Sequence, residues 1–100
     1  MPKEEPPVVY VAALGEAART EGFRLVKRLR GTGVKAEFDH VGRSFKAQFK
    51  HADKLGARVV AILGEDELSK GIVKLKRMDT GTETEAALSE VKEALFALLD

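Results

Sequence analysis

Two short apolar runs constrain the fold of this chain most. The residues Val8-Val9-Tyr10-Val11-Ala12 form a continuous β-branched and aromatic run, and residues 58–63 form a second apolar stretch. Strands that are hydrophobic on both faces are typical of parallel sheets covered by helices on either side. The two runs therefore predict strands that are buried on both faces.

Hydrophobic periodicity predicts the elements around these strands. A helix over about residues 16–30 has a buried stripe, in which Gly22 indicates a close approach to the sheet. Residues 34–38 and 72–77 alternate apolar and charged side chains, as strands with one solvent-exposed face do, and Asp39 is assigned to such a face. A second helix begins after a turn at 41–43 and ends at Gly56.

The C-terminal part completes the predicted topology. Residues 64–67 turn into a short helix that ends at Gly71, and Thr82 and Glu85 form the T-x-x-E pattern of a capping box before a final helix. The element order is βαβαβ, a short helix, β, then α. It predicts a single three-layer α/β domain with a mixed, mostly parallel sheet of four to five strands and helices on both faces, the last strand being able to run antiparallel at an edge.

Length and composition indicate one small globular domain. The chain has 100 residues, of which 44% are hydrophobic and 33% charged, and it contains no cysteine. Residues 1–7 hold all three prolines and are interpreted as a linker or tail, with the domain over 8–100. The longest apolar runs fall far short of the roughly 20 residues that cross a bilayer, and no signal peptide opens the chain. A cytoplasmic protein without a membrane partner is expected.

The net charge of +1 conceals a basic segment. Residues 19–58 contain eleven basic and four acidic residues, a net of +7 that leaves −6 for the rest. On the second helix the basic residues fall within an arc of roughly 80°, while Phe45 and Phe49 lie nearly opposite. Their rise of about 5 to 6 Å per step suits the phosphates of a nucleic-acid strand, although a solvated helix face explains the pattern as well. The residues of this arc are Arg43, Lys46, Lys50 and Lys54.

Other polar groups have structural explanations. The acids Glu65–Glu67 complement a helix dipole, and Lys74 and Lys76 on one strand face either reach a ligand or protect a sheet edge. His40 and His51 have no partner at metal-ligand spacing, so no metal site is expected. No nucleotide-cradling or acyl-transfer motif occurs, so no catalytic residue is assigned.

One ordered pattern resembles a known family. The run R-S-F-K-A-Q-F-K-H-A-D-K-L-G-A over residues 43–57, followed by G-E-D-E-L at 64–68 and G-I-V-K-L-K at 71–76, is similar to the C-terminal anticodon-binding domain of histidyl-tRNA synthetase. The resemblance covers about residues 8–98. Phe45 stands where leucine is usual, and Thr82-Glu83 stands where glutamine is common.

The resemblance implies that the chain binds the anticodon stem-loop of histidine tRNA and serves a catalytic domain of a histidine-tRNA ligase. It implies no DNA partner and no cofactor here, since ATP and Mg²⁺ belong to the parent's catalytic domain. The proline-bearing start favours an excised domain over a free-standing relative. By resemblance Glu67 and Lys76 contact anticodon bases, while Arg43, Ser44 and Lys46 lie near the loop and Lys50 and Lys54 follow its backbone.

Two other functions stay open. A synthetase-like domain without RNA binding would dock on a partner protein or on itself as an interaction or regulatory module. A small α/β enzyme has only its fold to support it, and a fold does not determine a function.

Overall fold

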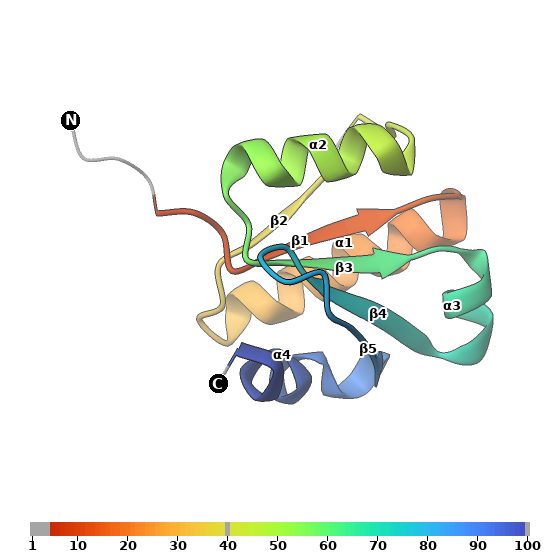
Figure 1. Ribbon diagram of the computed structural model, residues 1–100. Helices are drawn as coiled ribbons and strands as arrows, with labels where there is room; N and C mark the ends of the chain where they lie inside the picture. Colours follow the sequence, from red (N-terminus) through yellow and green to blue (C-terminus); the bar gives the residue numbers. More distant parts are fainter. Residues whose placement is uncertain (1–4, 40, 100) are drawn as a thin grey trace.

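The computed structural model describes residues 5–39 and 41–99, which contain one five-stranded sheet (Figure 1). The strands are β1 (Val9–Ala13), β2 (Ala36–Phe38), β3 (Val59–Leu63), β4 (Ile72–Arg77) and β5 (Glu83–Ala87). Their order across the sheet is β2-β1-β3-β4-β5. The first three strands are parallel, whereas β4 and β5 run antiparallel to their neighbours.

Helices cover both faces of this sheet. The helices are α1 (Glu16–Gly31), α2 (Phe45–Leu55), α3 (Glu65–Lys70) and α4 (Val91–Leu99). Figure 1 shows α2 on one face, α1 and α4 on the other, and α3 beyond one end of the strands. The predicted three-layer α/β architecture is therefore confirmed.

The apolar run at β1 divides between two cores. Val9 and Val11 belong to the larger cluster, on the side of α1 and α4, whereas Tyr10 and Ala12 belong to a smaller cluster under α2. Each of these four side chains is fully buried. Burying a large apolar side chain contributes about 1.5 to 3 kcal/mol, so a strand that is apolar on both faces stabilises the sheet on both faces.

The prediction of a helix beginning at Thr82 is wrong. Residues 83–87 form β5, which pairs with β4 from Lys76–Glu83 to Ile72–Ala87. The backbone groups of β4 would otherwise be unpaired at a sheet edge, and the pairing satisfies them. A tight turn permits the reversal, because Gly81 adopts the left-handed φ of 77° and the Arg77 amide donates to the Thr82 carbonyl at 2.9 Å. A short 3₁₀ turn, η1 (Leu88–Glu90), then leads into α4.

Part of the segment interpreted as a linker contacts the domain. Pro7 is buried, and the side chain of Lys35 donates a hydrogen bond to the Glu5 carbonyl. Residues 1–4 lie outside the described residues.

Gly22 lets α1 approach the sheet closely, as its position on the buried stripe predicts. A Cβ atom at this residue would lie 3.0 Å from the Phe38 ring and 3.2 Å from both Ala13 and Val11. Three contacts of this kind leave no space for a branched side chain.

We predict that Gly22→Val destabilises the domain by about 1 to 3 kcal/mol through overpacking. Gly31→Val is the matched control, because the same helix offers open space around a Cβ atom at Gly31. Urea unfolding of both variants checks this. Equal stability of the two variants would contradict the close approach.

Candidate nucleic-acid interface

The lysines of α2 form an exposed basic ridge. Lys46, Lys50 and Lys54 are exposed, while Phe45 and Phe49 are half-buried against the smaller core cluster. Within the described residues, no carboxylate lies within ion-pair distance of these three lysines. The α2 ridge, defined as Lys46, Lys50 and Lys54, therefore presents three uncompensated positive charges.

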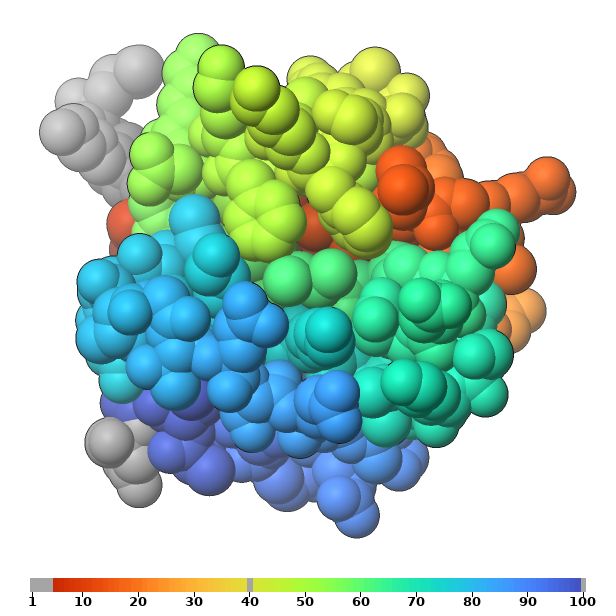
Figure 2. All heavy atoms as spheres, turned by 45° about the vertical axis from the view of Figure 1, so that its right-hand side comes forward, coloured from red at the N-terminus to blue at the C-terminus, as the bar shows by residue number. Residues whose placement is uncertain are grey.

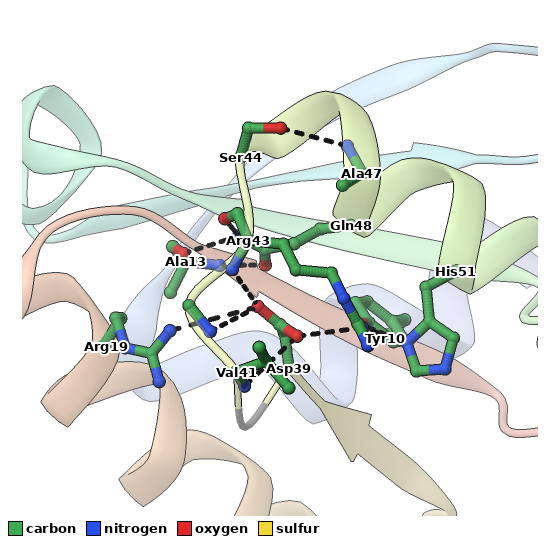
Figure 3. A network of polar contacts seen from close by, with 11 residues as sticks. Tyr10, Ala13, Arg19, Asp39, Val41, Arg43, Ser44, Ala47, Gln48 and His51 are labelled. Atoms are coloured by element: carbon green, nitrogen blue, oxygen red, sulfur yellow. Dashed lines mark hydrogen bonds and ion pairs between the residues drawn. The ribbon is translucent and has the colours of Figure 1, made fainter.

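Arg43, predicted as a fourth member, is not on the α2 ridge. It precedes the helix, and its Nη1 lies 3.1 Å from Oδ1 of Asp39 and 3.2 Å from Nδ1 of His51 (Figure 3). The geometry of an ideal helix does not apply to a residue before the N-cap, which explains the difference. The charge of Arg43 is thus largely compensated by Asp39.

Asp39 organises the loop before α2. Its carboxylate accepts hydrogen bonds from the backbone amides of Gly42 at 3.0 Å, Arg43 at 2.7 Å and Val41 at 3.4 Å. The assignment of Asp39 to an exposed strand face is wrong, because the residue is only 2% exposed. Burial alone would raise its pKa, but the amide hydrogen bonds and the Arg43 charge outweigh burial and hold the pKa of Asp39 below its ordinary value.

Gln48 joins α2 to the end of β1. Its side-chain amide accepts a hydrogen bond from the Ala13 amide at 3.1 Å and donates to the Ala13 carbonyl at 2.9 Å. It also donates to the Arg43 carbonyl at 2.6 Å. The residue is fully buried, and sequence reasoning gave it no role beyond its place in the family motif. With three hydrogen bonds this buried amide is fully paired, and it holds the start of α2 against the end of β1.

Tyr10 and His51 extend this network under α2. The Tyr10 hydroxyl lies 2.9 Å from Nδ1 of His51, and the two rings meet edge to face. Burial, followed by the negative charge of Asp39, raises the pKa of Tyr10 to about 12. His51 therefore contacts the network, whereas His40 lies outside the described residues.

Ser44 and Glu67 both cap helices. The Ser44 hydroxyl accepts a hydrogen bond from the Ala47 amide at 3.3 Å and begins α2. Glu67 Oε1 accepts from the Gly64 amide at 2.8 Å, so Glu67, in the first turn of α3 as expected, also caps this helix. These bonds fix both residues at the same end of the sheet.

A pocket lies where these two helices begin. It has a volume of about 470 Å³, and its lining residues include Phe45 at the start of α2 and Glu65–Glu67 at the start of α3. It lies at the carboxyl ends of β1 and β3, the position where ligands bind in open α/β sheets. Glu67 thus lines a pocket next to the α2 ridge.

Lys76 points toward α2 from β4. Its ammonium lies 5.5 Å from the centre of the Phe49 ring, within cation–π distance. The proposed role of Lys74 and Lys76 in protecting a sheet edge is wrong, because β4 is paired on both sides. Figure 2 shows α2 above the β4–β5 hairpin with a hollow between them. Because Lys76 contacts Phe49 of α2 from β4, it lies on the face of the sheet that α2 partly covers.

Other kinds of site receive no support from the described residues. Residues 5–39 and 41–99 contain no group of three or more side chains that could hold a metal ion. No helix in this part of the chain is long and apolar enough to cross a membrane.

Comparison with known proteins gives a consistent result. Residues 8–98 match a family model described as "Anticodon binding domain". A histidine–tRNA ligase of Caldanaerobacter subterraneus is 44% identical over 95 residues, which is 95% of this chain and 23% of that protein. One of Symbiobacterium thermophilum is 48% identical over 83 residues, 83% of this chain and 19% of that protein. The chain therefore spans about a fifth to a quarter of these relatives.

Solved structures agree with the sequence relatives. The histidyl-tRNA synthetase of S. aureus superimposes with a TM-score of 0.86 at 32% identity, over 92% of this chain and 24% of that chain. That of Nostoc sp. PCC 7120 also gives 0.86, at 27% identity over 96% of this chain and 23% of that chain. The RNA binding domain of threonyl-tRNA synthetase from Cryptosporidium parvum gives 0.81 at 16% identity, over 92% and 23% of the two chains, and shares the fold.

We predict that Asp39→Asn lowers the free energy of unfolding by about 2 to 4 kcal/mol near neutral pH, because it removes a buried charge that Arg43 and three amides stabilise. The pKa is lowered in the folded state, so this stabilisation is present above about pH 4 and is lost as pH falls further. Denaturant unfolding as a function of pH checks both points. Asp53→Asn, on the exposed surface of α2, is the control. If the difference in the free energy of unfolding between wild type and Asp39→Asn did not decrease below pH 4, the lowered pKa of Asp39 would be contradicted.

We also predict that Tyr10, the single tyrosine, ionises near pH 12 in the folded protein and near pH 10 in denaturant. The ultraviolet absorbance of tyrosinate reports both titrations. Since the raised pKa favours the folded state only while the phenol is protonated, the free energy of unfolding falls from about pH 10 upward. A midpoint near 10 with intact circular dichroism would show that the hydroxyl is not buried.

Proposed function

Because this chain belongs to the anticodon-binding domain family, in the form found in histidyl-tRNA synthetases, we propose that it binds the anticodon stem-loop of histidine tRNA. In this role it contributes to recognition of that tRNA for aminoacylation. Its second partner is the catalytic domain of a histidine-tRNA ligase, which carries the ATP and Mg²⁺ chemistry. No cofactor is assigned to the chain itself.

The α2 ridge is the observation that carries this proposal. Three exposed lysines on one helix face, without an ion pair to any described carboxylate, provide positive charge along the line that a phosphodiester backbone would follow. Phosphate contacts supply most of the affinity of such interfaces and carry no sequence information directly. Lys46, Lys50 and Lys54 are therefore proposed to bind the backbone.

Base recognition is proposed for the hollow beside the ridge. A carboxylate accepts hydrogen bonds from base amino and imino groups, and an ammonium donates to base carbonyls. Glu67 caps α3 through one carboxylate oxygen and lines the pocket, while Lys76 lies beside the Phe49 ring of α2. Unstacked anticodon bases would meet both groups.

Arg43 and Ser44 support this arrangement from the loop before α2. Both bind within the protein, through Asp39 and the Ala47 amide respectively. We propose that they set the position of the helix start near the anticodon loop, with the exposed Ser44 hydroxyl still accessible to RNA.

A protein-docking module is the second candidate. Val41 is 72% exposed, Phe96 54% and Phe23 46%, and exposed apolar side chains of this size are common at protein interfaces. Self-association in light scattering, without any response to RNA, would favour this function over RNA binding.

The deciding experiment is an amide chemical-shift titration of the labelled chain. The ligands are a stem-loop with the histidine anticodon and a control in which the loop is scrambled. Shifts at 44–54, 64–67 and 76 that are stronger with the cognate loop support anticodon recognition. No shift with either RNA at low salt would overturn the proposal.

We predict that Lys50→Ala weakens the binding of both RNAs alike. The slope of log K against log salt, about −2 for three neutralised phosphates, is expected to become shallower by about 0.7. Glu67→Gln keeps an acceptor for the Gly64 amide and is predicted to weaken the cognate loop selectively. Lys27→Ala, on the opposite side of the sheet, is the control for lost charge. Equal losses for Lys50→Ala and Glu67→Gln on both RNAs would refute the division between backbone and base contacts.

A further inference from the structure

The half of the sheet that α2 leaves uncovered has alternating charges. Lys74 and Lys76 lie on the α2 side of β4, since Val73 and Leu75 belong to the core cluster on the other side. The β4–β5 register places Glu85 opposite Lys74 and Glu83 opposite Lys76. Side chains directly opposite one another on paired strands point to the same face, so two ammonium groups and two carboxylates share this surface.

These four groups are not joined in close ion pairs. Within the described part of the chain, no contact of 4.0 Å or less links either lysine to either glutamate. Lys76 lies over the Phe49 ring instead, while Lys74, Glu83 and Glu85 line a hollow of about 280 Å³ with Thr84. Both glutamates are exposed and face whatever approaches the hollow.

The contrast with the α2 ridge is one of net charge. The ridge carries three positive charges, whereas the two lysines and two glutamates of the β4–β5 face give a net charge of zero. Like charges repel one another, and more strongly at a protein surface than in bulk water, so the carboxylates of β5 oppose the approach of a phosphate. A neutral base meets no such penalty, and it finds acceptors and donors for its edge on the same face.

We propose that Glu83 and Glu85 determine specificity by excluding phosphates from the β4–β5 face, so that a bound RNA loop lies with its backbone along the α2 ridge and its bases toward the sheet. This inference rests on the proposed function. The two glutamates need not touch a base to act. They disfavour the alternative orientation in which the RNA backbone crosses Lys74 and Lys76. Specificity arises in this way because the wrong binding mode is weakened, without any new contact in the correct one.

The test is the double variant Glu83→Gln/Glu85→Gln of the full chain, titrated with the cognate stem-loop and the loop-scrambled control. The scrambled RNA is expected to bind roughly three- to tenfold more tightly, because two exposed repulsive charges are lost. The preference for the cognate loop is expected to fall by a similar factor. The salt dependence is expected to steepen by about 0.7 to 1.4, the effect of one or two added phosphates.

Glu90→Gln/Glu93→Gln is the matched control, because it makes the same change in net charge on η1 and α4, away from the α2 side of the sheet. It is expected to leave the preference for the cognate loop unchanged. Thermal unfolding of both double variants verifies that the fold is retained.

The outcomes separate the two proposals. If wild type prefers the cognate loop and both double variants keep that preference, the role of Glu83 and Glu85 is refuted while the proposed function stands. If wild type binds neither RNA, or binds both equally, the proposed function and this inference fall together. A loss of preference in Glu83→Gln/Glu85→Gln alone supports the inference.

Discussion

The buried carboxylate of Asp39 is the constraint on which the rest of the interface depends. A charge in the interior is costly unless hydrogen bonds and an opposite charge compensate it, and here three consecutive amides and Arg43 do so. These bonds hold the loop in one conformation, and that conformation sets where α2 begins. Gln48 then fixes the first turns of α2 to the end of β1. The direction of the α2 ridge over the sheet is therefore set by two buried polar residues, Asp39 and Gln48, which are not part of the ridge.

Most of the fold was predictable because it follows from local periodicity. The runs at β1 and β3, the alternation in β4 and the apolar stripe of α1 each depend on residues close in sequence. Residues 83–87 were not predictable in this way, since the T-x-x-E pattern is typical of a helix start and only the unpaired edge of β4 favours a strand. Burial of Asp39 and Gln48 also depends on partners that are distant in sequence or lie in a loop, which a hydrophobicity pattern does not detect.

The candidate site was predicted in part for the same reason. Helical geometry placed Lys46, Lys50 and Lys54 together correctly, because all three lie inside α2. Arg43 lies one residue before the N-cap, where side-chain direction is set by the loop, and its partners could not be inferred from spacing. The RNA contacts assigned to Glu67 and Lys76 came from family resemblance and stay predictions. The sequence predicted Glu67 only as an acid that complements the dipole of α3, and its hydrogen bond to the Gly64 amide was not predicted.

The strand pairs of the sheet differ in how far apart their partners lie in the sequence. Val9 pairs with Val59 across half the chain, whereas Lys76 pairs with Glu83 across a single tight turn. Closing a long loop costs more chain entropy than closing a short one, so the outer hairpin is the part of the sheet that forms with least help from the rest. β5 lies at the edge of the sheet and is largely exposed, and Ala86 joins it to the larger core cluster. The surface that carries the alternating charges therefore depends on pairing between neighbouring segments, whereas the parallel core beside it joins segments that are far apart in the chain.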